Sequence, residues 1–367
     1  MSKKILIFIP SIEGGGVEKN LFLIVNYLSE FYDKTTIITC STDQIKYFRN
    51  KISVICPKFF DFRNSSRLVK YIVSIFFLIS NFLKERDTLI FSFQANLYCS
   101  LICKLFQRNI VIRSNSSSSG WSGGLIKSQI FKILFKLPNK IIVNSVDLKN
   151  EFIKKFDIKP VCIFNPFDKK DIKLKSKIKS KKYFKKSNKF MKIINVGRFV
   201  EQKNQILLLK ALNNLKDKIK FEALIMGSGK LKNFFQDYII QKKLSKIIKI
   251  IDYQKNPFGT MKQADLFVLT SNFEGMPNVL LESIYLNLSI ISSNCPTGPR
   301  EIIDKKYLFQ VNNLKDLQNK IQAFYKNEFL SHSKNFKKKH FKNLDKFNLD
   351  KNLLQYKKVI DGQFKKV

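Results

Sequence analysis

Residues 265–282 read DLFVLTSNFEGMPNVLLE. The apolar run at 266–269 predicts a buried strand, and the polar residues that follow predict a loop. A helix is expected to begin near Pro277 or Asn278, because proline fits the first helical turn, where its missing N–H would be unbonded anyway. The stretch therefore predicts one strand–loop–helix unit of an α/β fold.

The loop of this unit has the chemistry of a ligand site. Gly275 lets the backbone come close to a ligand, and the free N–H groups of a first helical turn suit sugar hydroxyls or an anion. Two acids, Glu274 and Glu282, bracket the helix start at the carboxyl end of a strand, where open α/β sheets bind their ligands. The alternative for two acids at this spacing alone is a surface loop with a helix cap.

The whole run, followed by SSNCPTGPRE at 292–301, resembles the donor-site segment of glycosyltransferase family 4. Members of that family are retaining, nucleotide-sugar-dependent enzymes of the GT-B fold. The resemblance covers nearly the full chain and implies two Rossmann-like, doubly wound domains that face each other across a cleft. It implies that the C-terminal domain holds a nucleoside-diphosphate sugar and that the N-terminal domain holds the acceptor.

Composition restricts the other function classes. The chain has 367 residues, which is the length of two domains, and 67 Lys and Arg against 28 Asp and Glu, for a net charge of +39. Such a balance raises nucleic acid or an anionic membrane as a partner. The excess is mostly lysine in a chain also rich in Ile, Asn and Phe, a bias typical of an A/T-rich genome. We expect no nucleic-acid partner, and a basic RNA- or membrane-binding module is the rival class.

The cysteines and the N-terminus indicate a cytoplasmic protein. The six cysteines are scattered without a paired metal spacing, so we expect reduced thiols and no metal site. The apolar run at 5–9 is too short for a signal peptide and predicts a buried first strand. The most apolar helical stretch, Lys70 to Leu83, is shorter than a membrane span. It predicts a packed amphipathic helix, with partial insertion in a bilayer surface as the alternative.

Strand patterns alternate with helical patterns along the chain, which predicts parallel, doubly wound sheets. The strands are expected at 5–9, 35–40, 52–56, 88–93, 110–113, 140–144, 161–164, 191–196, 221–226, 247–252, 265–270 and 288–292. We predict an acceptor domain at 1–168, a linker at 169–190 and a nucleotide-sugar domain at 191–349. A last helix at about 350–367 is expected to pack back on the first domain. The linker has 11 lysines between 169 and 189; it is interpreted as an exposed, edge-strand-like segment that a membrane could also bind.

Two loops of the first half are candidate contacts. Gly14, Gly15 and Gly16 follow the first strand and, by resemblance, lie across the cleft from the donor diphosphate; a tight turn is the alternative. Asn115 stands where the family commonly has a histidine that touches the donor sugar, so that contact is in doubt here. Trp121 is interpreted either as a stacking platform for a sugar or as a packed loop anchor.

A second strand–loop–helix unit carries two cations. Gly197 permits a turn after the strand at 191–196, and Arg198 and Lys203 follow in the loop. A guanidinium fork and an ammonium group both suit phosphate, and one loop can bring both to the same diphosphate. The Gly-Arg-x4-Lys spacing again resembles family 4. Gly227, which ends the next strand, is placed with the donor-binding residues.

The resemblance implies a role for each residue. Arg198 and Lys203 would stabilise the leaving diphosphate without a metal, and Glu274 would orient the donor sugar. Glu282 would accept from the ribose hydroxyls, and the helix start would contact the donor. The set expected at that helix start is Gly275, Met276, Pro277 and Asn278. Whether Glu274 acts as a nucleophile is open, since attack assisted by the leaving phosphate needs none.

The implied activity is metal-independent transfer of a hexose or N-acetylhexosamine from a nucleoside-diphosphate sugar, with UDP favoured over GDP and no other cofactor. The acceptor would be a lipid-linked glycan of bacterial surface-glycan synthesis, at the inner face of the plasma membrane. We expect a monomer or weak oligomer on an anionic membrane surface. A GT-B-fold epimerase or hydrolase is the enzymatic alternative. The only histidines, His332 and His340, lie in the lysine-rich tail, which argues against a Ser-His-Asp or Cys-His site.

Overall fold

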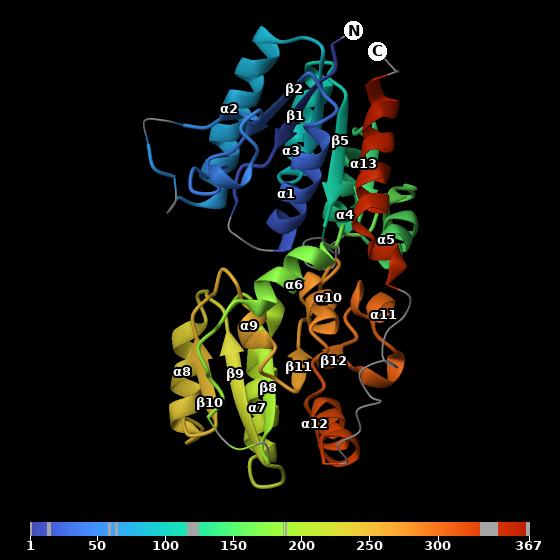
Figure 1. The fold of residues 1–367 in the computed structure, drawn as a ribbon. Coiled ribbons are helices and arrows are strands. Elements are labelled where there is room, and N and C mark those ends of the chain that lie inside the picture. Colours follow the sequence, from blue (N-terminus) through green and yellow to red (C-terminus); the bar gives the residue numbers. More distant parts are fainter. Residues whose placement is uncertain are drawn as a thin grey trace. The chain divides into compact units, whose positions relative to one another are not determined.

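The computed structural model describes residues 2–12, 16–57, 60–62, 65–115, 125–185, 187, 189–330 and 344–364. The chain forms two compact units, one of Met1–Pro166 with Lys346–Val367 and one of Phe167–Asp345. Each unit contains one parallel sheet with helices on both faces (Figure 1). The predicted class of two Rossmann-like, doubly wound domains is confirmed.

The first unit is built on a seven-stranded parallel sheet of order β3-β2-β1-β4-β5-β6-β7. The strands are β1 (Lys4–Phe8), β2 (Lys34–Ile38), β3 (Ser53–Ile55), β4 (Thr88–Ser92), β5 (Ile110–Ser114), β6 (Lys140–Val143) and β7 (Val161–Cys162). The central strands are continuous runs of buried residues, as expected for strands covered on both faces. The order of the strands reverses between β1 and β4, which makes the carboxyl ends of these two strands a topological switch point.

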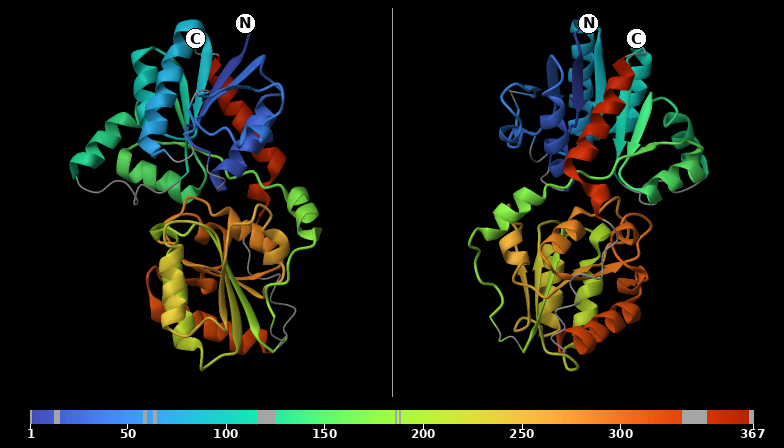
Figure 2. Two further views of the ribbon diagram at one scale, coloured as in Figure 1. Left: turned by 90° about the vertical axis from the view of Figure 1, so that its left-hand side faces the viewer. Right: turned by 45° about the vertical axis from the view of Figure 1, so that its right-hand side comes forward.

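Helices cover both faces of this sheet. α1 (Gly16–Leu28) and the last helix, α13 (Leu349–Phe364), contact each other and share one core with the sheet (Figure 2). The opposite core is covered by α2 (Arg67–Lys84), α3 (Asn96–Leu105), α4 (Leu125–Leu134) and α5 (Val146–Phe156). Local signals set the ends of these helices. For example, the Ser145 hydroxyl accepts from the Leu148 amide at 3.0 Å, and Asp157 ends α5 with a φ of 56°.

A buried arginine ties α13 to the sheet. Arg113 on β5 is 1% exposed. Its Nε donates to the Tyr356 hydroxyl at 2.7 Å, and its Nη2 donates to the Asn165 amide oxygen at 2.7 Å. The guanidinium also lies against the rings of Phe93 and Tyr356. Arg113 and Tyr356 are 243 residues apart in the sequence, so the hydrogen bond between them fixes the C-terminal helix on the first unit.

Tyr356→Phe should lower the free energy of unfolding by about 1–3 kcal/mol, because a buried charged nitrogen loses its acceptor. Burial raises the pKa of Tyr356 above the usual 10.0, and Arg113 opposes that shift. The folded state therefore holds the phenol proton where the unfolded state has lost it, so stability should fall as the pH rises above about 10. Urea titrations at pH 8 and above 10 check this, and the variant should show a shallower loss. An unchanged slope would contradict it.

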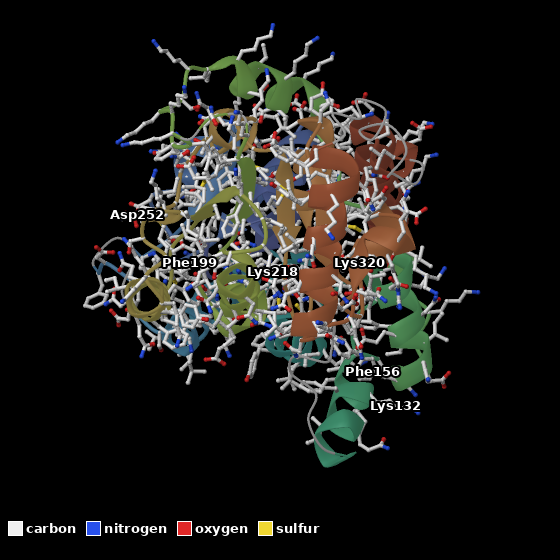
Figure 3. The ribbon with its side chains drawn as sticks, turned by 90° about the horizontal axis from the view of Figure 1, so that it is seen from below. Lys132, Phe156, Phe199, Lys218, Asp252 and Lys320 are labelled. Carbon is white, nitrogen blue, oxygen red and sulfur yellow. The ribbon has the colours of Figure 1, made fainter. Side chains whose placement is uncertain are left out.

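The second unit is built on a six-stranded parallel sheet of order β10-β9-β8-β11-β12-β13. The strands are β8 (Met191–Val196), β9 (Phe221–Met226), β10 (Ile248–Ile251), β11 (Leu266–Leu269), β12 (Ser289–Ser293) and β13 (Leu308–Phe309). β13 was not among the predicted strands, because two residues carry no periodicity. The helices are α6 (Lys169–Lys177), α7 (Gln205–Leu215), α8 (Lys232–Gln241), α9 (Phe258–Met261), α10 (Asn278–Tyr285), α11 (Pro299–Ile302) and α12 (Leu314–Phe324). Figure 3 shows α7 and α12 side by side, with Lys218 just beyond α7 and Lys320 on α12.

Most described residues of the lysine-rich segment at 169–190 are exposed. It belongs to the second unit, begins with α6 and then runs along the sheet edge. Ile172 and Phe184 are buried, and the Glu222 carboxylate accepts the Lys185 amide at 2.8 Å. Two apolar residues and one buried acid thus hold the segment despite its charge, a tertiary effect that composition does not reveal.

None of the helices within the described ranges is long and apolar enough to cross a membrane. The six cysteines are free thiols, four of them buried.

Candidate functional site

The candidate site lies at the switch point of the second sheet. β8 pairs with β9 on one side and with β11 on the other (Figure 1). The strand order reverses between β8 and β11, so the loops that leave their carboxyl ends border one crevice, where such sheets bind ligands. These two loops, residues 197–204 and 270–277, contain Arg198, Lys203 and Glu274, and the helix after the second loop contains Glu282.

Hydrogen bonds join the two loops. The Thr270 hydroxyl donates to the Lys203 carbonyl at 2.9 Å, and the Gln202 side chain donates to the Phe273 carbonyl at 2.9 Å. The Asn272 amide donates to the Gln202 carbonyl at 2.8 Å. Residues about 70 positions apart in sequence are therefore held as one surface.

Lys203 and Glu274 form an ion pair at the centre of this surface. The Lys203 Nζ lies 2.5 Å from the Glu274 Oε1, and the side chains are 17% and 8% exposed. The Ser271 hydroxyl donates to the same oxygen at 2.6 Å. Within the described residues the second carboxylate oxygen, Oε2, accepts no hydrogen bond, so it is the oxygen left to meet a ligand. The structure thus brings together Lys203 and Glu274, two of the four charged residues that the sequence singled out.

Hydroxyl groups from the next strand hold the Glu274 loop. The Ser293 hydroxyl, at the end of β12, donates to the Ser271 carbonyl at 2.6 Å. The Thr297 hydroxyl donates to the Glu274 carbonyl. Sequence reasoning did not assign these three hydroxyl residues to the site. The signal for Ser293 is the pair of buried serines, Ser292 and Ser293, that ends β12, where burial requires a hydrogen-bond partner.

A glycine contact shapes the same loop. Gly298 has a φ of 92°, and a Cβ built there would lie 2.4 Å from the Gly275 carbonyl oxygen and 2.7 Å from the Pro277 ring. Only glycine fits this approach. Gly298 was quoted in the family-like run but was not among the predicted site residues.

A second glycine contact shapes the cation loop. A Cβ at Gly227 would lie 1.9 Å from the Gly197 carbonyl oxygen, so Gly227 packs directly against the base of the Arg198 loop. The Phe199 amide donates to the Ser228 carbonyl at 2.7 Å, and the Phe199 ring is fully buried. Phe199, which is labelled in Figure 3, packs in the core and so anchors the loop that contains Arg198.

The other predicted residues of this unit lie around the ion pair. Arg198 is exposed, with its Nη2 3.5 Å from the Gln202 Oε1. Gly275, Met276 and Pro277 are buried, and Asn278 opens α10. Glu282 is one turn further along α10 and is 6% exposed. It is therefore not a solvated surface acid, as the alternative of a surface loop with a helix cap would require.

The remaining predicted site residues belong to the first unit. Gly16 opens α1, whereas Gly14 and Gly15 lie outside the described residues, as does Trp121. Asn115 follows β5, and its buried side-chain oxygen has no hydrogen-bond partner within the described part of the chain.

Cys295 is buried close to the ion pair. Burial and, to a smaller extent, the nearby Glu274 carboxylate raise the pKa of its thiol to about 12. The thiol therefore stays protonated at neutral pH and is no nucleophile there.

Ser271→Ala should lower kcat about tenfold, because about 1.4 kcal/mol corresponds to a factor of ten and one hydrogen bond to a charged group has that size. The Glu274 carboxylate would keep Lys203 but lose the donor that fixes its rotation. Steady-state rates for the two proteins check this. Ser100→Ala is the matched control, since that buried hydroxyl bonds only its own helix, at the Asn96 carbonyl. Equal losses in both variants would contradict the positioning role.

Two parallel sheets, each with helices on both faces, are the architecture of the GT-B fold. Residues 176–343 match the family model for glycosyl transferases group 1. The chain therefore contains a glycosyl transferases group 1 domain, as the resemblance predicted.

Three relatives illustrate the likeness. An uncharacterized glycosyltransferase of Methanocaldococcus jannaschii is 40% identical over 111 residues, 30% of this chain and 27% of that protein. A Campylobacter jejuni protein is 26% identical, over 63% of each chain; its name is N-acetylgalactosamine-N,N'-diacetylbacillosaminyl-diphospho-undecaprenol 4-alpha-N-acetylgalactosaminyltransferase. The aligned parts thus span less than two thirds of these two relatives. The crystal structure of Anabaena HepE with UDP and glucose matches with a TM-score of 0.73 at 16% identity, covering 98% of this chain and 100% of that one.

Proposed function

We propose that this chain is a retaining glycosyltransferase that moves a hexose or N-acetylhexosamine from a nucleoside-diphosphate sugar to a lipid-linked glycan. The observation that carries the proposal is the Lys203–Glu274 pair at the switch point of the second sheet. A nearly buried ion pair is costly to form, and open α/β sheets bind their ligands at such crevices. The family of the domain makes sugar transfer the matching chemistry.

Lys203 and Arg198 provide the positive charge that the reaction needs. As the bond between sugar and diphosphate breaks, negative charge grows on the leaving oxygen, and fixed cations lower the energy of that state. Lys203 is held in place by Glu274, whereas Arg198 stands exposed on an anchored loop and can close on the diphosphate. With two cations in these positions, we infer that transfer needs no divalent metal.

Glu274 and Glu282 have different roles in the proposal. Oε1 of Glu274 is occupied by Lys203 and Ser271, so Oε2 is the atom that meets the hydroxyls of the donor sugar. Glu282 accepts from the ribose hydroxyls, and the first turn of α10, with Gly275 to Asn278, contacts the donor. A carboxylate held by a lysine is a poor nucleophile, which favours front-face attack assisted by the leaving phosphate.

The donor and acceptor classes come from the relatives. UDP is favoured as the nucleotide because HepE was crystallised with UDP and glucose. A lipid diphosphate acceptor is supported by the name of the Campylobacter relative. Surface-glycan synthesis at the inner face of the plasma membrane follows from such an acceptor. The same proposal includes a contribution of Asn115 to the choice of donor sugar.

The test is a product analysis with purified full-length protein. UDP-glucose, UDP-N-acetylglucosamine, UDP-N-acetylgalactosamine and the GDP-sugars are each offered with a short undecaprenyl-diphosphate glycan, with and without EDTA. The expected result is UDP release with elongation of the glycan, unaffected by EDTA, and a product anomer that NMR shows to match the donor. UDP release without elongation would favour the hydrolase alternative. Absence of both binding and release for every nucleotide sugar would reject the proposal.

A further inference from the structure

A glutamine begins helix α7 inside an apolar core. Gln205 is fully buried, and Leu207, Leu208 and Leu209 of the same helix belong to the core of the second unit. Burying a side-chain amide among apolar residues is costly unless hydrogen bonds replace those that it made with water. The hydrogen bond that Gln205 makes therefore indicates what this residue holds in place.

The partner of Gln205 is a backbone carbonyl of the loop at 197–204. The Gln205 Nε2 donates to the Arg198 carbonyl at 2.9 Å, and the same carbonyl accepts from the Val200 amide at 3.0 Å. At the other end of this peptide unit, the Phe199 amide donates to the Ser228 carbonyl at 2.7 Å. The peptide unit that joins Arg198 to Phe199 is thus hydrogen-bonded at both of its polar atoms.

The backbone before Arg198 is held as well. The Gly197 amide donates to the Met226 carbonyl at 3.0 Å, and Gly227 packs closely against the Gly197 carbonyl oxygen. Because each planar peptide unit moves as one body, holding the units on both sides of Arg198 fixes the direction of its bond from Cα to Cβ. Loss of the Gln205 donor would loosen one of these two units and let the direction of the Arg198 side chain vary.

The two cations of the site are held in different ways. Lys203 is held at its charged end, where its Nζ lies 2.5 Å from the Glu274 Oε1. The Arg198 side chain is exposed, so its placement depends more on the backbone that carries it. Gln205 provides a buried side-chain donor to that backbone.

We propose that Gln205 is a positioning residue for Arg198: its amide holds the loop so that the guanidinium meets the diphosphate of the donor. A side chain that leaves a fixed backbone loses less conformational freedom on binding than one on a mobile loop. The benefit therefore appears in the affinity for the diphosphate and not in the affinity for the nucleoside. This inference rests on the proposed function and adds to it a residue that is buried behind the loop.

The experiment compares UDP binding, measured by calorimetry, with uridine binding, measured by ligand-observed NMR, in the full-length protein. Gln205→Met keeps the length of the side chain and removes the donor. It should weaken UDP binding about tenfold, roughly the effect of losing one charge-assisted hydrogen bond to the diphosphate. Uridine binding should stay as in the wild type, because uridine has no diphosphate. The thermal midpoint should move by no more than about 4 °C, since methionine suits the apolar surroundings.

Three further variants make the test specific. Gln205→Asn, whose amide is one methylene shorter, should show the same loss and replaces Gln205→Met if that variant does not fold. Gln363→Met is the matched control, because Gln363 is also buried but lies on α13 of the first unit; it should change neither affinity. In an Arg198→Ala background, Gln205→Met should weaken UDP binding by less than about twofold more, since the side chain that it positions is gone.

UDP binding that is unchanged in the Gln205 variants would overturn the inference and leave the proposed function standing. Equal losses of UDP and uridine affinity would also overturn it, because they would assign Gln205 to the stability of the whole unit. A full tenfold loss in the Arg198→Ala background would have the same consequence. A wild-type protein that binds no UDP would reject the proposed function, and this inference with it.

Discussion

Lys203→Met is expected to lower kcat about 10²–10³-fold, the loss seen when one fixed donor to a developing negative charge is removed. The methionine side chain keeps the length and most of the volume of lysine but cannot donate to Glu274 or to a diphosphate. The buried carboxylate keeps Ser271 as its only side-chain partner, so the free energy of unfolding should also fall by about 1–3 kcal/mol. Rates at saturating UDP-sugar and urea titrations measure the two effects.

The control is a lysine whose ion pair lies in water. Lys230 and Glu201 are 2.9 Å apart, but their side chains are 68% and 79% exposed. Lys230→Met should change stability by less than about 0.5 kcal/mol and leave the rate unchanged. Adding Glu274→Gln to Lys203→Met should cost less than the sum of the single losses, since both remove the same pair. A Lys203→Met enzyme with the wild-type rate would contradict the assigned role.

Gly298→Ala is expected to lower the free energy of unfolding by about 2–4 kcal/mol and to weaken UDP-sugar binding at least tenfold. The left-handed φ of 92° costs an L-residue about 1–3 kcal/mol, and the new methyl group must displace the Gly275 carbonyl. The displaced segment carries Glu274 and the start of α10, so affinity and stability should fall together. Calorimetric titration with the UDP-sugar and thermal unfolding measure this.

Gly362→Ala is the matched control, because nothing lies within 4 Å of a Cβ at that position in α13. It should stabilise the protein by roughly 0.5–1 kcal/mol, the gain of alanine over glycine within a helix. Wild-type affinity in Gly298→Ala would show that the glycine contact does not shape the donor loop.

The pattern of strands and helices could be predicted from the sequence, because a strand buried on both faces is a continuous apolar run. The loops at 197–204 and 270–277 could be predicted as well, since glycine, proline and charged residues gather where a strand ends. That made Arg198, Lys203, Glu274 and Glu282 candidates before any distance was known. β13 was not predicted, because Leu308 and Phe309 follow two lysines in a segment that was interpreted as a loop.

The sequence by itself determined two parallel α/β units and the residue types at the carboxyl ends of their strands, because these depend on short-range periodicity and turn chemistry. Only the tertiary structure decided that Ser271, Ser293 and Thr297 hold Glu274, and that Gly298 must be glycine. It alone also showed that α2 has large apolar residues both in the core and exposed to solvent. These contacts join residues that are far apart in the sequence. The packing of the sheet and its loops decides which of them meet, and local sequence patterns do not reveal it.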